Sequence, residues 1–177
     1  GSLMQEQGLD DIVVGRDGRL SGPDMVAGLV RGLRRAGRNV IDIGLVPTPV
    51  TYFGAFHLRT GCCISVTGSH NPPDYNGFKI VVGGNTLSGD AITDLYARIA
   101  EDRLHVAREP GGVTQRDIAD DYVDRIASDV EGFTDDREIA SQMLLQTTAQ
   151  PGGDLKAVER ALDEELHASL DESQIYR

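Results

Sequence analysis

The chain lacks tryptophan, has only two cysteines and contains no run of eighteen apolar residues. Without such a run it offers no membrane-spanning helix, so we expect a soluble globular protein with no membrane partner. Its cysteines, Cys62 and Cys63, are adjacent in a predicted strand, where successive side chains face opposite ways. We therefore interpret them as small buried hydrophobic residues in a reducing cytoplasm rather than as a disulfide.

Basic side chains are also scarce, with 17 Lys and Arg against 28 Asp and Glu and a net charge of -11. Nucleic-acid binding needs a basic face, so we expect no nucleic-acid partner. Lysine is rarest, because Lys79 is the only one before Lys156. A secretory signal is lacking as well, since no basic segment precedes an apolar core near Gly1. We expect a cytoplasmic protein.

What the sequence does contain is an alternation of β-branched runs and amphipathic segments. The runs predict strands at residues 11–14, 39–46, 62–67 and 78–82. The amphipathic segments predict helices from about Pro23 to Gly37, Val50 to Leu58, Ser88 to Arg103 and Thr114 to Val130. This order predicts an α/β fold, a three-layer α/β/α sandwich with a mixed, mainly parallel four-stranded sheet whose fourth strand runs antiparallel to the third.

The composition changes after Val130. Residues 1–130 form the predicted domain, and residues 131–177 form a predicted acidic helical tail of unknown role. The tail holds 11 acidic and 4 basic side chains, and its helices are predicted at residues 135–150 and 154–169. We find no catalytic grouping in it.

The loop between the third and fourth predicted strands is longer than a hairpin requires. It carries the hydroxyl of Ser69, the imidazole of His70 and, at its far end, the ammonium group of Lys79. Gly68 leaves the serine accessible, and Pro72-Pro73 stiffens the middle. Physical reasoning alone leaves two interpretations open, a rigid surface turn and a site that presents Ser69.

Two arginines, Arg16 and Arg19, follow the first predicted strand just before a helix begins. In α/β proteins this edge of the sheet collects anions, so both are candidate phosphate ligands; solvated surface arginines are the alternative. Two other kinds of site are excluded by pattern. The G-x-S-x-G serine elbow is absent because Asn71 occupies its last position, and no loop ends in the Gly-Lys-Ser/Thr of a Walker A motif.

The segment Thr67–Lys79, Thr-Gly-Ser-His-Asn-Pro-Pro-Asp-Tyr-Asn-Gly-Phe-Lys, closely resembles the active-site phosphoserine loop of the α-D-phosphohexomutases. Within that superfamily it is most similar to the bacterial phosphomannomutase/phosphoglucomutase group. A looser resemblance runs from about Leu3 to about Val130, which corresponds to domain one of a four-domain enzyme. It does not extend to the tail.

The resemblance implies an intramolecular phosphotransferase that interconverts hexose 1- and 6-phosphates through a phosphoserine, as part of a complete enzyme. Ser69 would carry the phosphoryl group, and its phosphate would help to hold Mg²⁺. Lys79 would be the general acid/base, with His70 or Arg16 as helper, and the division of roles between them stays open.

Substrate phosphate would be bound by Arg16, Arg19 and Asn71. The implied partners are glucose or mannose 1- and 6-phosphates, the bisphosphate intermediate and the remaining domains of the enzyme.

The sequence also departs from the family. The Asp-Gly-Asp-x-Asp-Arg metal loop and the sugar-selecting Gly-Glu-x-Ser loop do not occur in it. We therefore expect the chain by itself to be inactive as a mutase. A noncatalytic domain that binds sugar phosphate or a partner protein is the alternative, and the preference between glucose and mannose stays open.

Overall fold

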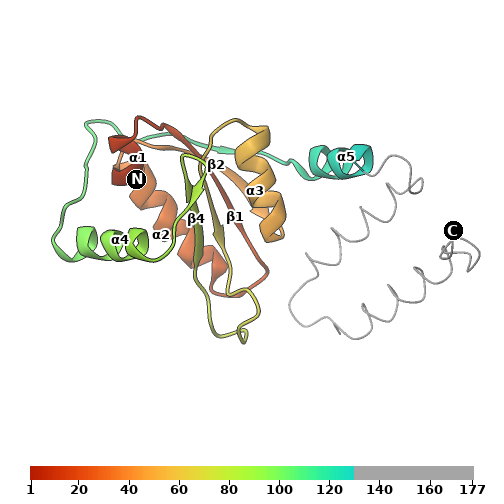
Figure 1. Ribbon diagram of the computed structural model, residues 1–177, viewed down its shortest axis with the longest axis horizontal. Helices are drawn as coiled ribbons and strands as arrows, with labels where there is room; N and C mark the ends of the chain where they lie inside the picture. Colours follow the sequence, from red (N-terminus) through yellow and green to blue (C-terminus); the bar gives the residue numbers. More distant parts are fainter. Residues whose placement is uncertain (130–177) are drawn as a thin grey trace, which may run out of the picture.

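The structure is a computed structural model that describes residues 1–129 (Figure 1). Its strands are β1 (Asp11–Arg16), β2 (Asn39–Leu45), β3 (Cys63–Val66), β4 (Phe78–Val82), β5 (Asn85–Thr86) and β6 (Val113–Gln115). Its helices are α1 (Ser2–Glu6), α2 (Gly22–Arg35), α3 (Thr48–His57), α4 (Asp90–Ala100) and α5 (Ala119–Asp129). None of these helices is long and apolar enough to cross a membrane.

The strands form one mixed sheet in the order β5-β4-β3-β1-β2-β6. β1 pairs in parallel with β2 and β3, and β2 pairs in parallel with β6. β4 is antiparallel to β3, as predicted, and β5 is antiparallel to β4. The carboxyl ends of β1 and β3 therefore lie side by side at one edge of the sheet, where the loops that follow them meet.

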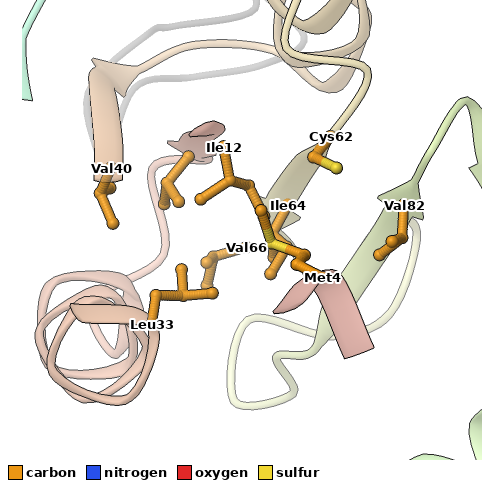
Figure 2. Close-up of a cluster of buried hydrophobic side chains, with 9 residues drawn as sticks. Met4, Ile12, Leu33, Val40, Cys62, Ile64, Val66 and Val82 are labelled. Carbon is orange, nitrogen blue, oxygen red and sulfur yellow. The ribbon is translucent and has the colours of Figure 1, made fainter. Parts of the chain in front are cut away.

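Each face of the sheet carries its own hydrophobic core. Ile12 and Val14 of β1 pack with Leu33 of α2 and Met4 of α1 on one face (Figure 2). Val13 points to the other face, where it packs with side chains of α3 and with Ile118 just before α5. In Figure 1 the two groups of helices accordingly lie on opposite sides of the strands. The predicted three-layer α/β/α sandwich is confirmed.

The sheet has six strands in the described residues rather than the predicted four. β6 lies in the segment where we expected Thr114 to begin a helix, and this prediction is wrong. Thr114 pairs with Ile41 of β2, and the helix begins only at Ala119, whose amide donates to the carboxylate of Asp117. A three-residue strand is too short to show an alternating pattern in the sequence. It also depends on pairing with β2, which lies some seventy residues earlier in the chain. The helices predicted within residues 131–177 lie outside the described residues.

Candidate functional site

The loop that carries Ser69 connects β3 to β4 at the edge where β1 also ends. Arg16, the last residue of β1, pairs with Val66, the last residue of β3. The amide of Asp17 then donates to the carbonyl of Val66 at 3.0 Å. These contacts place the β1–α2 loop, residues 17–21, directly beside the Ser69 loop, residues 67–77.

The Ser69 loop is closed at its neck and folded by its own hydrogen bonds. Thr67 donates its amide to the carbonyl of Gly77 at 3.0 Å. Within the loop, Asn71 donates to Gly68 and Tyr75 donates to Pro72, both at 3.0 Å. These bonds give the loop a defined shape that a merely long connection would lack.

Ser69 itself has an unusual backbone. Its φ is +54°, a left-handed conformation that is unfavourable for residues with a side chain. Its amide donates to the hydroxyl of Thr67 at 2.9 Å, and its carbonyl accepts from Arg19 at 3.0 Å. The residue is nevertheless exposed. The backbone of Ser69 is therefore fixed on both sides while the residue remains open to solvent.

The side chain of Arg19 reaches from the β1–α2 loop into the Ser69 loop. Its Nη1 donates to the carbonyls of Pro72 and Tyr75 at 2.5 and 2.7 Å. Its Nη2 donates to the carbonyls of Ser69 and Asn71 at 3.0 and 2.8 Å. These two nitrogens thus bind four carbonyls of one loop.

The remaining donor of this guanidinium, Nε, binds Oδ2 of Asp17 at 3.1 Å, and Oδ1 of Asp17 accepts the Arg19 amide at 3.1 Å. Sequence reasoning missed this role of Asp17, although an Asp two residues before its partner amide is typical of an Asx turn.

Gly68 and Asn76 also help to join these two loops. Gly68 lies against Arg19: a Cβ at this position would collide with the guanidinium and lie 2.6 Å from the carbonyl oxygen of Tyr75. Only glycine leaves room for the arginine at this point. Asn76 donates from Nδ2 to the hydroxyl of Ser21 at 3.0 Å. Gly68 and Asn76 therefore help to join loops that lie about fifty residues apart in the chain.

Lys79 and Arg16 lie at this edge of the sheet but on opposite faces. Lys79 pairs directly with Ser65, which faces α3 and lies 3.3 Å from the hydroxyl of Thr48. Residues directly opposite in an antiparallel pair share a face, so Lys79 lies on the α3 side. Arg16 lies on the α2 side, because a Cβ on Gly22 would be 3.3 Å from its Cδ.

The structure thus brings Ser69, His70 and Asn71 together with Arg19, while Arg16 and Lys79 flank them. Arg16 donates to the carbonyl of Asp17 at 3.2 Å. Within residues 1–129, none of Arg16, His70 and Lys79 is hydrogen-bonded to Ser69. The described residues also contain no group of three His, Cys, Asp or Glu side chains that could hold a metal ion.

A separate cavity of about 360 Å³ lies between α1, α2, α4 and the sheet. Its walls are mainly apolar, with Leu29, Leu33 and Ile99 among them, and no residue of the Ser69 loop lines it. Arg98, which is among its charged lining residues, is already paired with Glu6 and Asp94. The cavity is separate from the Ser69 loop, so it is not part of the candidate site.

The sequence pattern of a known family, described as phosphoglucomutase/phosphomannomutase, alpha/beta/alpha domain I, matches residues 1–105. The chain is 46% identical over 126 residues to a phosphoglucomutase of Neisseria gonorrhoeae. The matched residues make up 71% of this chain and 27% of the relative. It is 48% identical over 130 residues to a phosphomannomutase/phosphoglucomutase of Pseudomonas aeruginosa. This match covers 73% of this chain and 28% of the relative.

A solved structure agrees with these sequence matches. The crystal structure of a phosphoglucomutase/phosphomannomutase family protein from Burkholderia thailandensis superimposes with a TM-score of 0.68 and 51% sequence identity. The superimposed region covers 72% of this chain and 29% of the Burkholderia protein. The chain therefore spans somewhat more than a quarter of the length of the proteins that it matches.

Proposed function

Because this chain belongs to the phosphoglucomutase/phosphomannomutase family and matches its first domain, we propose that it carries the phosphoryl-accepting serine of a hexose-phosphate mutase. The observation that carries this proposal is Ser69, an exposed serine whose backbone is fixed by Thr67 and Arg19. A residue that must receive and return the same group many times benefits from such a rigid support.

The proposed step is a phosphoryl transfer from a hexose 1,6-bisphosphate. The Ser69 oxygen forms a bond to phosphorus, and the bond from phosphorus to the sugar oxygen breaks. The proton of the Ser69 hydroxyl passes to a base, and the departing sugar oxygen is protonated. Lys79 is proposed as the general acid/base of this exchange, with His70 or Arg16 as helper. The reverse transfer returns the phosphoryl group to the other hydroxyl of a hexose monophosphate.

Burial distinguishes Ser69 from the other hydroxyls of this segment. Ser65 is 1% exposed and faces the hydroxyl of Thr48. Thr67 is 8% exposed and its hydroxyl accepts the Ser69 amide. Neither can meet a sugar phosphate without unfolding the edge of the sheet, so Ser69 is the acceptor that we propose.

Mg²⁺ would be held in part by the phosphate of Ser69, where it would neutralise charge on the transferred group. The residues described here do not fit a complete site for this ion, since they offer no cluster of three potential ligands. The proposed chemistry of this chain therefore rests on its own side chains. The remaining ligands and the substrate specificity belong to the proposal that further domains complete the enzyme.

The test is incubation of the chain, joined to the remaining domains of the enzyme, with hexose 1,6-bisphosphate and Mg²⁺, followed by phosphopeptide mass spectrometry. We expect one phosphate, located on Ser69, and none in the variant Ser69→Ala. Phosphate on Ser65 or Thr67 would contradict the assignment. Binding of the bisphosphate without transfer would instead support the alternative function, a noncatalytic sugar-phosphate-binding domain. Continuous turnover of hexose 1-phosphate by this chain alone would contradict the need for further domains.

A further inference from the structure

We propose that Arg19 is a positioning residue that holds the phosphoryl-accepting loop in shape and does not itself bind the transferred phosphate. This inference rests on the proposed function of Ser69. It replaces the expectation, drawn from sequence, that Arg19 is a phosphate ligand.

The first argument is a count of donors. A guanidinium has five N–H groups and no acceptor. In Arg19 each of the five has a partner within the protein, namely the carboxylate of Asp17 and the four carbonyls of Ser69, Asn71, Pro72 and Tyr75. The side chain is also only 12% exposed. A phosphate could bind this guanidinium only by breaking bonds that the loop already uses.

The second argument concerns the direction of the peptide groups. No peptide bond in the described residues is cis, so each carbonyl that points at Arg19 has its following N–H pointing away. The carbonyls of Asn71 and Pro72 precede prolines, which have no N–H to leave unpaired. The carbonyls of Ser69 and Tyr75 precede His70 and Asn76, whose N–H groups therefore point away from the guanidinium. Arg19 thus binds the negative ends of these peptide dipoles, and the N–H groups of His70, next to Ser69, and of Asn76 are directed away from it, where they can face an anion.

The third argument is the strain at Ser69. A left-handed backbone at a residue with a side chain persists only where the surroundings impose it. Here Thr67 fixes the amide of Ser69 and Arg19 fixes its carbonyl. Gly68 has no side chain at the point where one would displace the guanidinium. Three residues thus act together on the conformation of the acceptor, and neutralisation of its phosphate falls to Arg16, His70 and Lys79.

The experiment uses the 177-residue chain and its variant Arg19→Lys, with Arg31→Lys as the matched control. Lysine keeps the charge but cannot reproduce five donors in a planar fork. Arg31 is an exposed arginine of α2. The first measurement is hydrogen exchange, by NMR, at the hydrogen-bonded amides of Ser69, Asn71 and Tyr75, with the Val13 amide of the core as reference.

We expect Arg19→Lys to accelerate exchange at these three loop amides by at least about tenfold, since each bond to a charged donor is worth more than that factor. Exchange at Val13 and in Arg31→Lys should stay within about twofold of wild type. Equal loop exchange in the two variants would overturn the proposal. If Arg19→Lys also loosens Val13, the milder variant Asp17→Asn, which removes the charge but keeps one oxygen acceptor, provides the same comparison.

The second measurement separates positioning from phosphate binding. Hexose 1,6-bisphosphate is titrated into the wild-type chain while the Nε–H signals of its arginines are followed. We expect the signal of Arg19 to stay in place. In the transfer assay, Arg19→Lys should lower the rate at saturating bisphosphate and leave the half-saturating concentration within about twofold. A moving Arg19 signal, or a raised half-saturating concentration with an unchanged saturating rate, would make Arg19 a phosphate ligand and overturn the proposal.

The two proposals fail in different ways. If wild-type Ser69 takes up no phosphate when the remaining domains are present, the proposed function is contradicted. Loop exchange in Arg19→Lys still decides in that case whether Arg19 holds the loop.

Discussion

Cys62 and Cys63 are neighbours in the chain, but their side chains lie in different hydrophobic cores. Cys62 packs with Met4 and Ile12 on the α2 face of the sheet, and Cys63 packs with Val13 on the α3 face. Both are free thiols with no exposed surface. The alternation of side chains along a strand, visible in the sequence, was enough to predict this separation.

Burial makes both thiols unreactive. It raises the pKa of Cys62, and it raises that of Cys63 to about 12. Because the thiolate is the reactive form, we expect iodoacetamide at pH 8 to label neither cysteine in the folded chain. Both should be labelled in 6 M urea, as measured by intact mass. Rapid labelling of the folded chain at either position would contradict the packing described for the two cores.

The contact between Gly68 and Arg19 predicts the effect of a single methyl group. Gly68→Ala should destabilise the folded state by roughly 1–3 kcal/mol, because its Cβ would collide with the guanidinium and with the carbonyl of Tyr75. The matched control is Gly77→Ala in the same loop, where the nearest atom to the new Cβ is 3.7 Å away. Urea unfolding of the two variants measures the difference. Equal midpoints would show that the loop can move aside for the methyl group.

A second prediction concerns the hydroxyl that fixes the Ser69 amide. Thr67→Val keeps the shape of the side chain but leaves that amide without its acceptor, which should cost roughly 1–3 kcal/mol. Thr67→Ser retains the hydroxyl and should lose much less. Exchange of the Ser69 amide should follow the same order, fastest in Thr67→Val. Equal losses of stability in the two variants would show that the hydrogen bond from the Ser69 amide to the Thr67 hydroxyl contributes nothing of its own.

The sequence predicted the layers of this fold because they depend on local patterns. The run at Ile12–Val14 is β-branched and apolar, the run at residues 78–82 ends in three β-branched residues, and both strands are confirmed. β6 was missed because Val113–Gln115 is too short to carry a pattern and depends on pairing with β2.

The candidate site was predictable only in part. The Ser69 loop is a contiguous segment, so its composition and its resemblance to a family identify it directly. The bonds from Arg19 to the loop join residues 50 to 56 positions apart, and no local sequence pattern predicts such bonds. The position of Arg19 just after a strand suggested an anion ligand. Sequence alone cannot reveal which donors of its guanidinium are already bound to the protein.

A surface ion-pair group predicts a dependence of stability on pH. Arg98 of α4 binds both carboxylate oxygens of Glu6 at 2.6 and 2.9 Å, and it also binds Asp94. The hydrogen bond from Arg98 lowers the pKa of Glu6 below its ordinary value of 4.5. A carboxylate whose pKa is lowered by folding stabilises the folded state above its ordinary pKa, and this stabilisation disappears as the pH falls through the folded value.

We therefore expect the chain to lose more stability than Glu6→Gln does as the pH falls from 7 to 3. The two proteins should differ at pH 7 and converge below pH 4.5. Urea unfolding at a series of pH values measures this. Asp94 titrates in both proteins and binds the same guanidinium, so the comparison measures Glu6 together with its coupling to Asp94. Curves that stay parallel across the whole range would show that the Glu6 contact adds nothing to stability.

The last prediction tests whether Lys79 transfers a proton or only supplies charge. Lys79 of β4 lies opposite Ser65 of β3, at the edge of the sheet from which the Ser69 loop projects. An ammonium group can release its proton to a reacting oxygen, whereas a guanidinium stays protonated at any working pH. Lys79→Arg should therefore slow phosphoryl transfer to Ser69 by roughly 10²–10⁴-fold, the range typical of general acid/base catalysis. Because the charge is kept, binding of the bisphosphate should change by less than about twofold.

The comparison with Lys79→Gln, which removes both the charge and the proton, decides between the two roles. If Lys79 transfers a proton, Lys79→Arg and Lys79→Gln should both transfer slowly, and only Lys79→Gln should also bind the bisphosphate more weakly. If Lys79 supplies charge alone, Lys79→Arg should transfer at nearly the wild-type rate and Lys79→Gln should not. Transfer at the wild-type rate by both variants would remove Lys79 from the mechanism, and His70 would then be the remaining titratable candidate among the residues that flank Ser69.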